Sequence, residues 1–408
     1  MLDSADPASF AWEVIHRRHP ALVEQVLAAH PYGPRQVGAL RRLAEEAPGG
    51  VVGPLGDTFD VAAWRVWGAG RFGQTWDEVP YLWAESYFYR RLLDAVGFFD
   101  PGPWFWLDPF ADRKAAELAD PGLVAVLAAL DELPDLTPAA RADAVLAASL
   151  WGNRADLGFA LHAGAATAER AADLVVDDSG AFWARLGGDV QVAVVADNAG
   201  RELLADLVLT DELLASGRAS EVTIHVKPTP YYVSDATTAD VSDCLRRLGT
   251  AGGYAARVAK RLAAAFRSGR IGLRTHWFWV APLELSQMPA DLVAQFEAST
   301  VTILKGDLNY RRLVGDRHWS PTTDPAVAAK RFPAPWVALR TLKSEVVVGV
   351  DPDRLRRLDE RPGWRVSGSH AMIQSGSGQG GAEPPRGAPD RCADGDRPVT
   401  PATPRRRR

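Results

Sequence analysis

Polar side chains follow several apolar, β-branched runs in the second half of the chain. Asp197 and Asn198 come directly after the run Val192–Ala196. Other polar residues stand in comparable places: Lys227 and Asp235 after 222–226, Lys305 and Asp307 after 301–304, and Arg340 to Lys343 before 345–350. Carboxylate and amide oxygens suit Mg²⁺ or Mn²⁺, whereas lysine and arginine suit phosphate. The set therefore indicates metal-assisted phosphate chemistry.

Each of these groups alone has an ordinary structural explanation. An aspartate after a strand is most often the N-cap of the next helix, and Asp197 fits that role. In an open parallel sheet, however, ligands bind beyond the carboxyl ends of the strands, near a switch in strand order. The four groups would converge there if their strands are neighbours in the sheet.

The elements that must position these residues change in kind along the chain. Up to about residue 170 the helical period dominates, and from Ala171 short β-branched runs alternate with helical segments. Such alternation is typical of a mostly parallel sheet that is covered on both faces. We therefore expect an N-terminal helical domain over 1–170, an α/β core that binds metal and substrate over 171–374, and a disordered tail over 375–408, where apolar residues are scarce.

Composition limits the class of protein. The chain has 408 residues, 47% hydrophobic, with a net charge of −5, which gives no reason to expect nucleic-acid or membrane binding. Only Cys244 and Cys392 are present, so a disulfide framework is not expected. No segment approaches the roughly 20 apolar residues of a spanning helix. We expect a soluble, cytoplasmic protein. The string "GAGRFG" lies in the helical half and does not open a helix, so it is not read as a dinucleotide site.

Four segments carry a family resemblance. "DNAGRELLADL", "KPTPYYVSD", "KGDLNYRRLVGD" and "RTLK", in this order, resemble the DUF89 family, and within it the damage-control phosphatases with the RTxK motif, also described as acidic-residue methyltransferase-like. "WAESYFYRRL" and "LWGNRADLG" agree, and the resemblance runs from about Trp12 to Gln374. It implies a helical bundle packed on a three-layer α/β/α core, and a phosphatase that uses Mn²⁺, Mg²⁺, Co²⁺ or Ni²⁺ on sugar phosphates such as fructose 1-phosphate or fructose 6-phosphate.

The resemblance also implies roles for individual residues. The metal ligands would be Asp197, Asn198 and Asp235. The substrate-binding residues would be Asp307, Leu308, Asn309, Tyr310, Arg311 and Lys343. The catalytic set would be Asp197, Asn198, Glu202, Asp235 and Lys343. The chain departs from the usual pattern at Arg201, where the family often has an apolar residue, and we expect that change to alter the pocket rim rather than the metal site.

The favoured mechanism is hydrolysis by a metal-activated water, with Lys343 and Arg311 offsetting phosphoryl charge. Glu202 is a candidate for orienting that water, or else an acid favoured by the start of a helix. Asp197 as a covalent phosphate acceptor stays open. Gly200 is expected to let the backbone pass close to the ligands.

Two other functions remain alternatives. One is S-adenosylmethionine-dependent protein-glutamate O-methyltransfer, for which the resemblance places Glu202 and Asp235 near the cofactor. The chain lacks a glycine-rich first strand-to-helix turn followed by an acidic residue, which argues against it. The other is an inactive phosphometabolite-binding protein. The intact set of acid, amide and lysine residues argues against it, because charged groups brought together without a ligand would cost stability.

Further residues have two possible roles each. Asn153 and Asp156 could support the site or cap helices. Glu85 could pair with Arg90 across a helix turn or reach the core. Trp277 and Trp279 could line a sugar pocket or serve packing.

Overall fold

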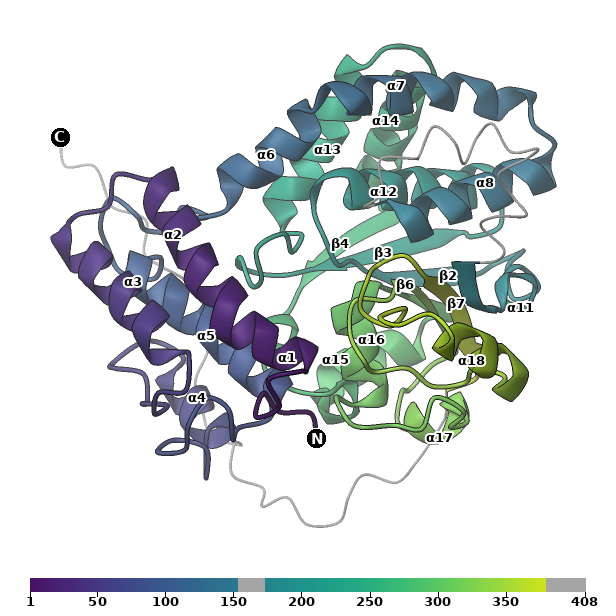
Figure 1. Cartoon of the computed structure of the whole chain (residues 1–408). Helices are drawn as coiled ribbons and strands as arrows, with labels where there is room; N and C mark the ends of the chain where they lie inside the picture. Colours follow the sequence, from purple (N-terminus) through teal and green to yellow (C-terminus); the bar gives the residue numbers. More distant parts are fainter. Residues whose placement is uncertain (153–172, 379–408) are drawn as a thin grey trace, which may run out of the picture.

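One seven-stranded sheet forms the centre of the protein. The computed structural model describes residues 1–152 and 173–378 (Figure 1). The strands run in the order β1-β7-β6-β5-β2-β3-β4, and all neighbours are parallel except β6 and β7. Their bounds are β1 (Leu174–Asp177), β2 (Gln191–Val195), β3 (Glu221–Val226), β4 (Ile271–Thr275), β5 (Val301–Lys305), β6 (Trp336–Thr341) and β7 (Ala371–Gly376). The expectation of a mostly parallel sheet is confirmed.

The strand order reverses between β2 and β5. From β2 the chain builds outward through β3 to β4, whereas β5 adds on the other side of β2 and leads to β6. Val195 is in register with Leu304 of β5 and His225 of β3, so the ends of these three strands lie side by side. Such a switch point is where open α/β sheets bind their ligands.

Helices cover both faces of the sheet, as expected for buried apolar strands. β5 and β6 are buried along their whole lengths. Figure 1 shows one face covered by α6 (Ala111–Ala119), α7 (Pro121–Ala129), α8 (Pro138–Trp151), α12 (Gly200–Ala215), α13 (Thr238–Thr250) and α14 (Gly253–Arg267). The other face carries α15 (Ala290–Glu297), α16 (Gly306–Val314), α17 (Pro325–Ala328) and α18 (Pro352–Asp359). The short α11 (Ser179–Trp183) follows β1. This is the three-layer core that the sequence predicts.

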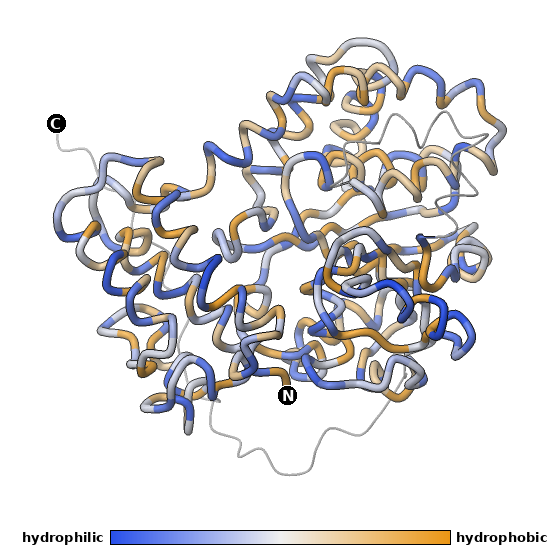
Figure 2. The backbone as a smooth tube through the Cα atoms, viewed as in Figure 1, coloured by the Kyte–Doolittle hydropathy of each residue, from blue (hydrophilic) through white to orange (hydrophobic). Residues whose placement is uncertain are grey.

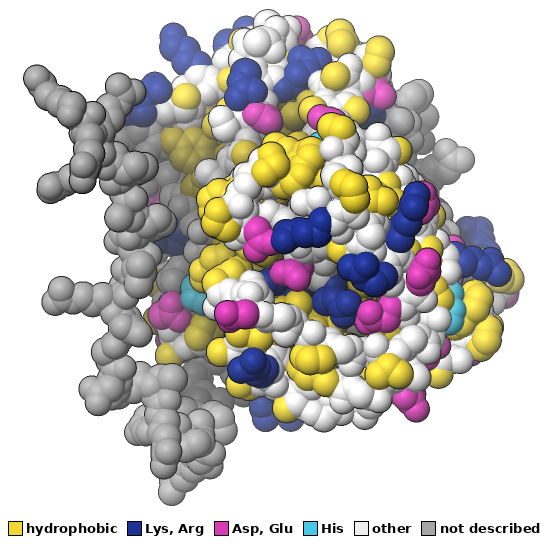
Figure 3. Space-filling view, turned by 90° about the vertical axis from the view of Figure 1, so that its left-hand side faces the viewer, with side chains coloured by type: hydrophobic (Ala, Val, Ile, Leu, Met, Phe, Trp, Pro, Cys, Tyr) yellow, Lys and Arg dark blue, Asp and Glu magenta, His cyan; other side chains and the backbone are white. Residues whose placement is uncertain are grey.

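The remaining helices form the N-terminal part of the molecule. They are α1 (Phe10–Glu13), a π-helical turn (Val14–Arg18), α2 (His19–Ala29), α3 (Pro34–Glu46), α4 (Val61–Trp67) and α5 (Tyr81–Val96). All but three of the residues in α5 are buried, because the other helices and the core surround it. Polar and apolar residues alternate along the outer helices in Figure 2. On the face that Figure 3 shows, acidic and basic side chains lie next to one another.

The helices before residue 170 belong to two different parts of the structure. α8 packs on α12 and α6 also contacts it, so the helices from Ala111 onward belong to the layers around the sheet. The change of pattern at Ala171 marks the approach of β1, and β7 reaches Gly376, two residues beyond the expected core boundary. Most of the predicted tail, 379–408, lies outside the described residues. None of the described helices is long and apolar enough to cross a membrane.

Candidate active site

The segments that follow β2 and β3 fold against each other at the switch point. The Ala236 amide donates to the Asp197 carbonyl oxygen at 2.8 Å. Asn198 and Asp235 form an isolated antiparallel bridge. The three residues predicted as metal ligands, 38 positions apart at most, are therefore held together by backbone hydrogen bonds. The strand register and the geometry of the turns therefore place these three residues close together.

The Asn198 amide joins the acidic side chains of the site. Its Nδ2 donates to Asp197 Oδ2 at 3.2 Å and to Glu202 Oε2 at 2.8 Å. Its Oδ1 accepts a hydrogen bond of 2.6 Å from the Ser234 hydroxyl. Because both amide hydrogens point to carboxylates, the amide oxygen faces the other way with a fixed orientation. The sequence did not single out Ser234, whose only signal is its place beside Asp235.

Asp197 lies in an environment that opposes its negative charge. It is 7% exposed. Burial raises the pKa of Asp197 well above its ordinary value, and the carboxylates of Glu202 and Asp235 raise it further, against the ammonium groups of Lys227 and Lys343. A buried group of acids whose charge is incompletely balanced is the electrostatic setting that a cation would relieve.

Two lysines at strand ends are buried beside these acids. Lys227 Nζ donates to the Ala196 carbonyl oxygen at 2.9 Å and lies 3.9 Å from Asp235 Oδ1. Lys305 Nζ lies 3.0 Å from Asp206 Oδ1 and 4.0 Å from Glu202 Oε1. The strand-end pattern had indicated both lysines. The structure gives them internal carboxylate and carbonyl partners.

Asp235 and Glu202 are both enclosed. Asp235 Oδ2 accepts from the Tyr232 amide at 3.1 Å, and its carbonyl oxygen accepts from Lys114 Nζ at 2.8 Å. Glu202, in the first turn of α12, is 5% exposed and is held by Asn198. Glu202 therefore lies both near a helix start and beside the predicted ligand Asn198, and its role in orienting a water stays a prediction.

The first turn of α16 lies directly against Asp197. Gly306 has a φ of 79°, and a Cβ added there would overlap the Asp197 carboxylate. Only glycine combines that left-handed backbone with so close an approach. Gly200 also has a positive φ, 67°, and the space beside its Cα is filled by the Glu117 carboxylate of α6. Gly200 therefore lets α12 pack against α6, and the expectation that it lets the backbone pass close to the ligands stays a prediction.

Asp307 anchors the RTxK motif. Its Oδ1 accepts from Arg340 Nε at 2.8 Å, from the Lys343 backbone amide at 3.1 Å and from the Ser344 hydroxyl at 3.3 Å. Burial disfavours its charge, but Arg340 and Arg311 outweigh burial and hold the pKa of Asp307 below its usual value. The ionised Asp307 carboxylate thus fixes the backbone of Lys343, whose own side chain is exposed.

The other members of the predicted substrate segment point in different directions. Asn309 Nδ2 donates to the carbonyl oxygens of Lys305 (2.8 Å) and Ala196 (3.3 Å), while its Oδ1 is buried without a partner in the part of the chain that is described. The Tyr310 hydroxyl donates to Gln374 at 2.8 Å. Leu308 packs with Leu82 and Tyr231. Leu308 and Tyr310 therefore serve packing in this structure.

Arg311 is occupied by two carboxylates. It pairs with Asp316 through two hydrogen bonds of 2.8 and 2.9 Å, and with Glu85 Oε2 of α5 at 2.9 Å. Glu85 therefore reaches across to α16. Arg90 instead pairs with Asp60 at 2.7 Å and more loosely with Asp94 at 3.4 Å. The positive charge of Arg311 is balanced inside the protein, which weakens the expectation that it offsets phosphoryl charge.

The remaining predicted residues lie away from Asp197 or outside the described chain. Arg201 pairs with Asp120 at the start of α7, at 2.5 Å. Trp279 is buried against His225. Trp277 is exposed beside a separate cavity. Asn153 and Asp156 fall within 153–172, outside the described residues.

Asp197, Asn198 and Asp235 fit a hard divalent cation. Across 1–152 and 173–378 no three His, Cys, Asp or Glu side chains are grouped as a metal site. The predicted set differs from such a group because its third member is an amide. The carboxylates of Asp197 and Asp235 are oxygen donors of the kind that Mg²⁺ and Mn²⁺ prefer, and the Asn198 amide oxygen, which here accepts from Ser234, is a third.

Comparison with known proteins agrees with the residue pattern. The family model described as the damage-control phosphatase ARMT1-like domain matches residues 14–357. Proteins named damage-control phosphatase ARMT1 are similar: that of Danio rerio is 29% identical over 74% of this chain and 75% of its own, and that of Bos taurus is 32% identical over 73% and 75%. A DUF89 family protein from Pyrococcus horikoshii shares the fold, with a TM-score of 0.51 and 14% identity over 89% of this chain and 96% of its own. The chain therefore belongs to the damage-control phosphatase ARMT1-like family.

Proposed function

We propose that this protein is a divalent-metal-dependent phosphatase that hydrolyses small sugar phosphates, in the manner of metabolite damage control. The observation that carries the proposal is the buried Asp197 carboxylate. Burial and the nearby charges of Glu202 and Asp235 raise its pKa, and the ammonium groups of Lys227 and Lys343 lower it. Such a site combines hard oxygen ligands with cations that suit phosphate. The names of the relatives support phosphatase chemistry; the choice of fructose 1-phosphate or fructose 6-phosphate rests on the family resemblance alone.

Asp197, Asn198 and Asp235 would hold Mn²⁺, Mg²⁺, Co²⁺ or Ni²⁺. When bound, the metal supplies Lewis-acid stabilisation of the charge on the phosphoryl group. Glu202 accepts from Asn198 Nδ2, and the Ser234 hydroxyl donates to Asn198 Oδ1, so the two together fix the orientation of the amide. Glu202 is thus a positioning residue, and its further role in orienting the attacking water is part of the proposal.

Lys343 is the group we assign to the substrate phosphate. Its side chain is exposed, whereas its backbone amide is held by the ionised Asp307. The exposed ammonium group can reach a ligand while the backbone that carries it is held in place. This arrangement suits the binding of a phosphoryl oxygen. Arg340 acts through Asp307, to which it lies at 2.7 Å, and needs no contact with the substrate.

The test measures phosphate release from a panel of sugar phosphates with each of the four metals. We expect turnover that a chelator abolishes and that the added metal restores. Asp197→Ala is the matched inactive variant, because it removes a ligand and few packing contacts. Metal binding by the parent without phosphate release from any sugar phosphate would refute the proposal. Trapping of a stable aspartyl phosphate at Asp197 would replace the water mechanism by covalent transfer.

The alternative enzyme class, a methyltransferase, is tested by a binding measurement. Glu202 and Asp235 are 5% and 2% exposed, and both are bonded to neighbours within the site. Nothing in those contacts favours a nucleoside cofactor. Calorimetry with S-adenosylmethionine should show no heat of binding, and micromolar binding would support the methyltransferase alternative.

A further inference from the structure

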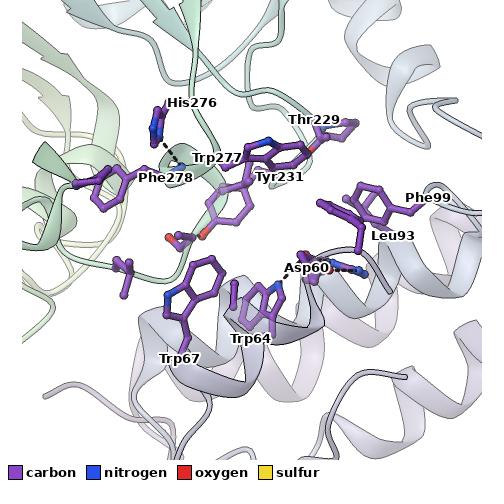
Figure 4. Close-up of a pocket in the computed structure, with 18 of the residues that line it drawn as sticks. Asp60, Trp64, Trp67, Leu93, Phe99, Thr229, Tyr231, His276, Trp277 and Phe278 are labelled. Atoms are coloured by element: carbon purple, nitrogen blue, oxygen red, sulfur yellow. Dashed lines mark hydrogen bonds and ion pairs between the residues drawn. The ribbon is translucent and has the colours of Figure 1, made fainter. Parts of the chain in front are cut away.

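A cavity lies between the N-terminal helices and the loops that follow β3 and β4. Its volume is about 460 Å³. Trp64 and Trp67 of α4 form one wall, and Tyr231, Trp277 and Phe278 form the other (Figure 4). None of the ten residues predicted for the active site is in its lining. This cavity and the proposed chemistry are therefore in different places.

The charged groups of this lining neutralise each other. Asp60 accepts from Arg90 Nε at 2.8 Å and from Trp64 Nε1 at 3.0 Å. A second Arg90 nitrogen donates to Asp60 at 2.7 Å and to the Thr58 hydroxyl at 2.8 Å. The guanidinium also lies 4.5 Å from the ring centre of Phe99. The pair is held at the cavity without an unbalanced charge that could attract an ion.

Two further polar side chains of the lining, Tyr231 and His276, are also partnered. The Tyr231 hydroxyl donates to the Ser86 hydroxyl at 2.6 Å. His276 Nδ1 accepts from the Phe278 amide at 2.9 Å, and its Nε2 lies 3.2 Å from Asp291. A charged ligand would lose its hydration here and gain no unpaired partner from these groups. The complementary ligand is therefore uncharged.

The aromatic rings give the cavity its shape. At the rim, Phe59 and Trp277 are 58% and 48% exposed, and their ring centres are 5.2 Å apart. Phe99 lies 5.0 Å from Phe59 on the inner side. Large apolar rings left in water gain free energy when a ligand covers them, and flat partners stack on them best. A volume of this size also falls in the range of small-molecule sites.

We propose that this cavity binds an uncharged, planar aromatic small molecule. The site is distinct from the proposed phosphatase site, because its lining includes none of the residues assigned to that site. The two are neighbours: Tyr231 lines the cavity and packs with Leu308, and the next residue, Tyr232, donates its amide to Asp235. Binding in the cavity should thus leave room for a sugar phosphate at the other site.

The test uses prodan, an uncharged naphthalene dye whose fluorescence reports an apolar environment. We expect saturable, micromolar binding by the full chain. Ala63 is half-buried in the cavity wall, so Ala63→Phe should place a ring in the space that the dye needs and weaken binding at least tenfold. The neighbouring Ala62 is exposed and outside the lining, and Ala62→Phe should bind like the parent.

A second variant guards against misfolding. Trp277→Ala removes an exposed rim ring, so the fold should persist, and we expect about tenfold weaker binding. Absence of saturable prodan binding, equal binding by the parent and both cavity variants, or equally tight binding of the anionic dye 8-anilinonaphthalene-1-sulfonate would overturn the proposal. Phosphate release should be unchanged in Ala63→Phe, so failure here and failure of the phosphatase proposal can be told apart.

Discussion

Gly306 and Asp197 approach each other so closely that no side chain fits between the start of α16 and the carboxylate. We predict that Gly306→Ala lowers kcat/KM roughly a hundredfold, because the added methyl displaces a proposed metal ligand. Gly200→Ala is the matched control: its φ is also positive, but its neighbour is Glu117. Both variants should lose stability, since alanine is strained at a positive φ. Metal titration and kinetics separate them, and equal kinetic losses would show that strain alone is responsible.

Lys343 is predicted to act on substrate through its charge. Lys343→Met keeps the apolar stem, and kcat/KM should fall roughly a hundredfold, with little change in metal affinity. Lys343→Arg should restore activity only in part, because a planar guanidinium does not replace a compact ammonium. Lys330→Met, at another exposed lysine, is the control. Near-parent kinetics in Lys343→Met would remove this lysine from the site.

Arg311 is predicted to matter for stability first. Arg311→Met leaves Glu85 and Asp316 buried and uncompensated, so the free energy of unfolding should fall by about 3–5 kcal/mol. The double variant Arg311→Met/Asp316→Asn should recover part of that loss, because it also removes one stranded charge. Denaturant unfolding measures both. An Arg311→Met protein that is as stable as the parent but has a raised KM would show instead that Arg311 binds phosphate.

His19 should make the protein sensitive to acid. Its ring is buried and stacks on Phe88 at 3.7 Å, and neither ring nitrogen has a hydrogen-bond partner among the described residues. Burial lowers the pKa of His19 from 6.5 to about 3. The unfolded chain therefore binds the proton more readily, so stability is fullest above pH 6.5 and falls as the pH drops toward 3.

His19→Phe should remove this part of the pH dependence. We expect the parent to lose about 2–3 kcal/mol from this residue near pH 4, and the variant to lose correspondingly less. The exposed His318, changed in the same way, is the control. Unfolding curves between about pH 4 and pH 7 decide it, and parallel pH profiles for parent and His19→Phe would contradict the prediction.

The sequence by itself determined the class of fold and predicted the members of the site. Short, β-branched, fully apolar runs such as Val192–Ala196 favour strands buried on both faces, and each is followed by polar residues at its carboxyl end. The family segments then identified Asp197, Asn198 and Asp235, which the structure brings together through one antiparallel bridge. The fold inference succeeded because hydrophobic period and strand-end position are local properties of the chain, whereas the assignment of the three ligands rests on the family resemblance.

Only the tertiary structure decided which partner each charged residue takes. Arg311 faces Glu85, 226 positions away, and Gly200 faces Glu117. Such partners depend on how α5 and α6 pack on the core, which no local pattern records. The aromatic cavity has the same origin, because rings from α4 and from the loops beyond β3 and β4 meet only after the N-terminal helices dock. Long-range packing therefore determines which partners these residues contact, because the strand-end pattern does not specify them.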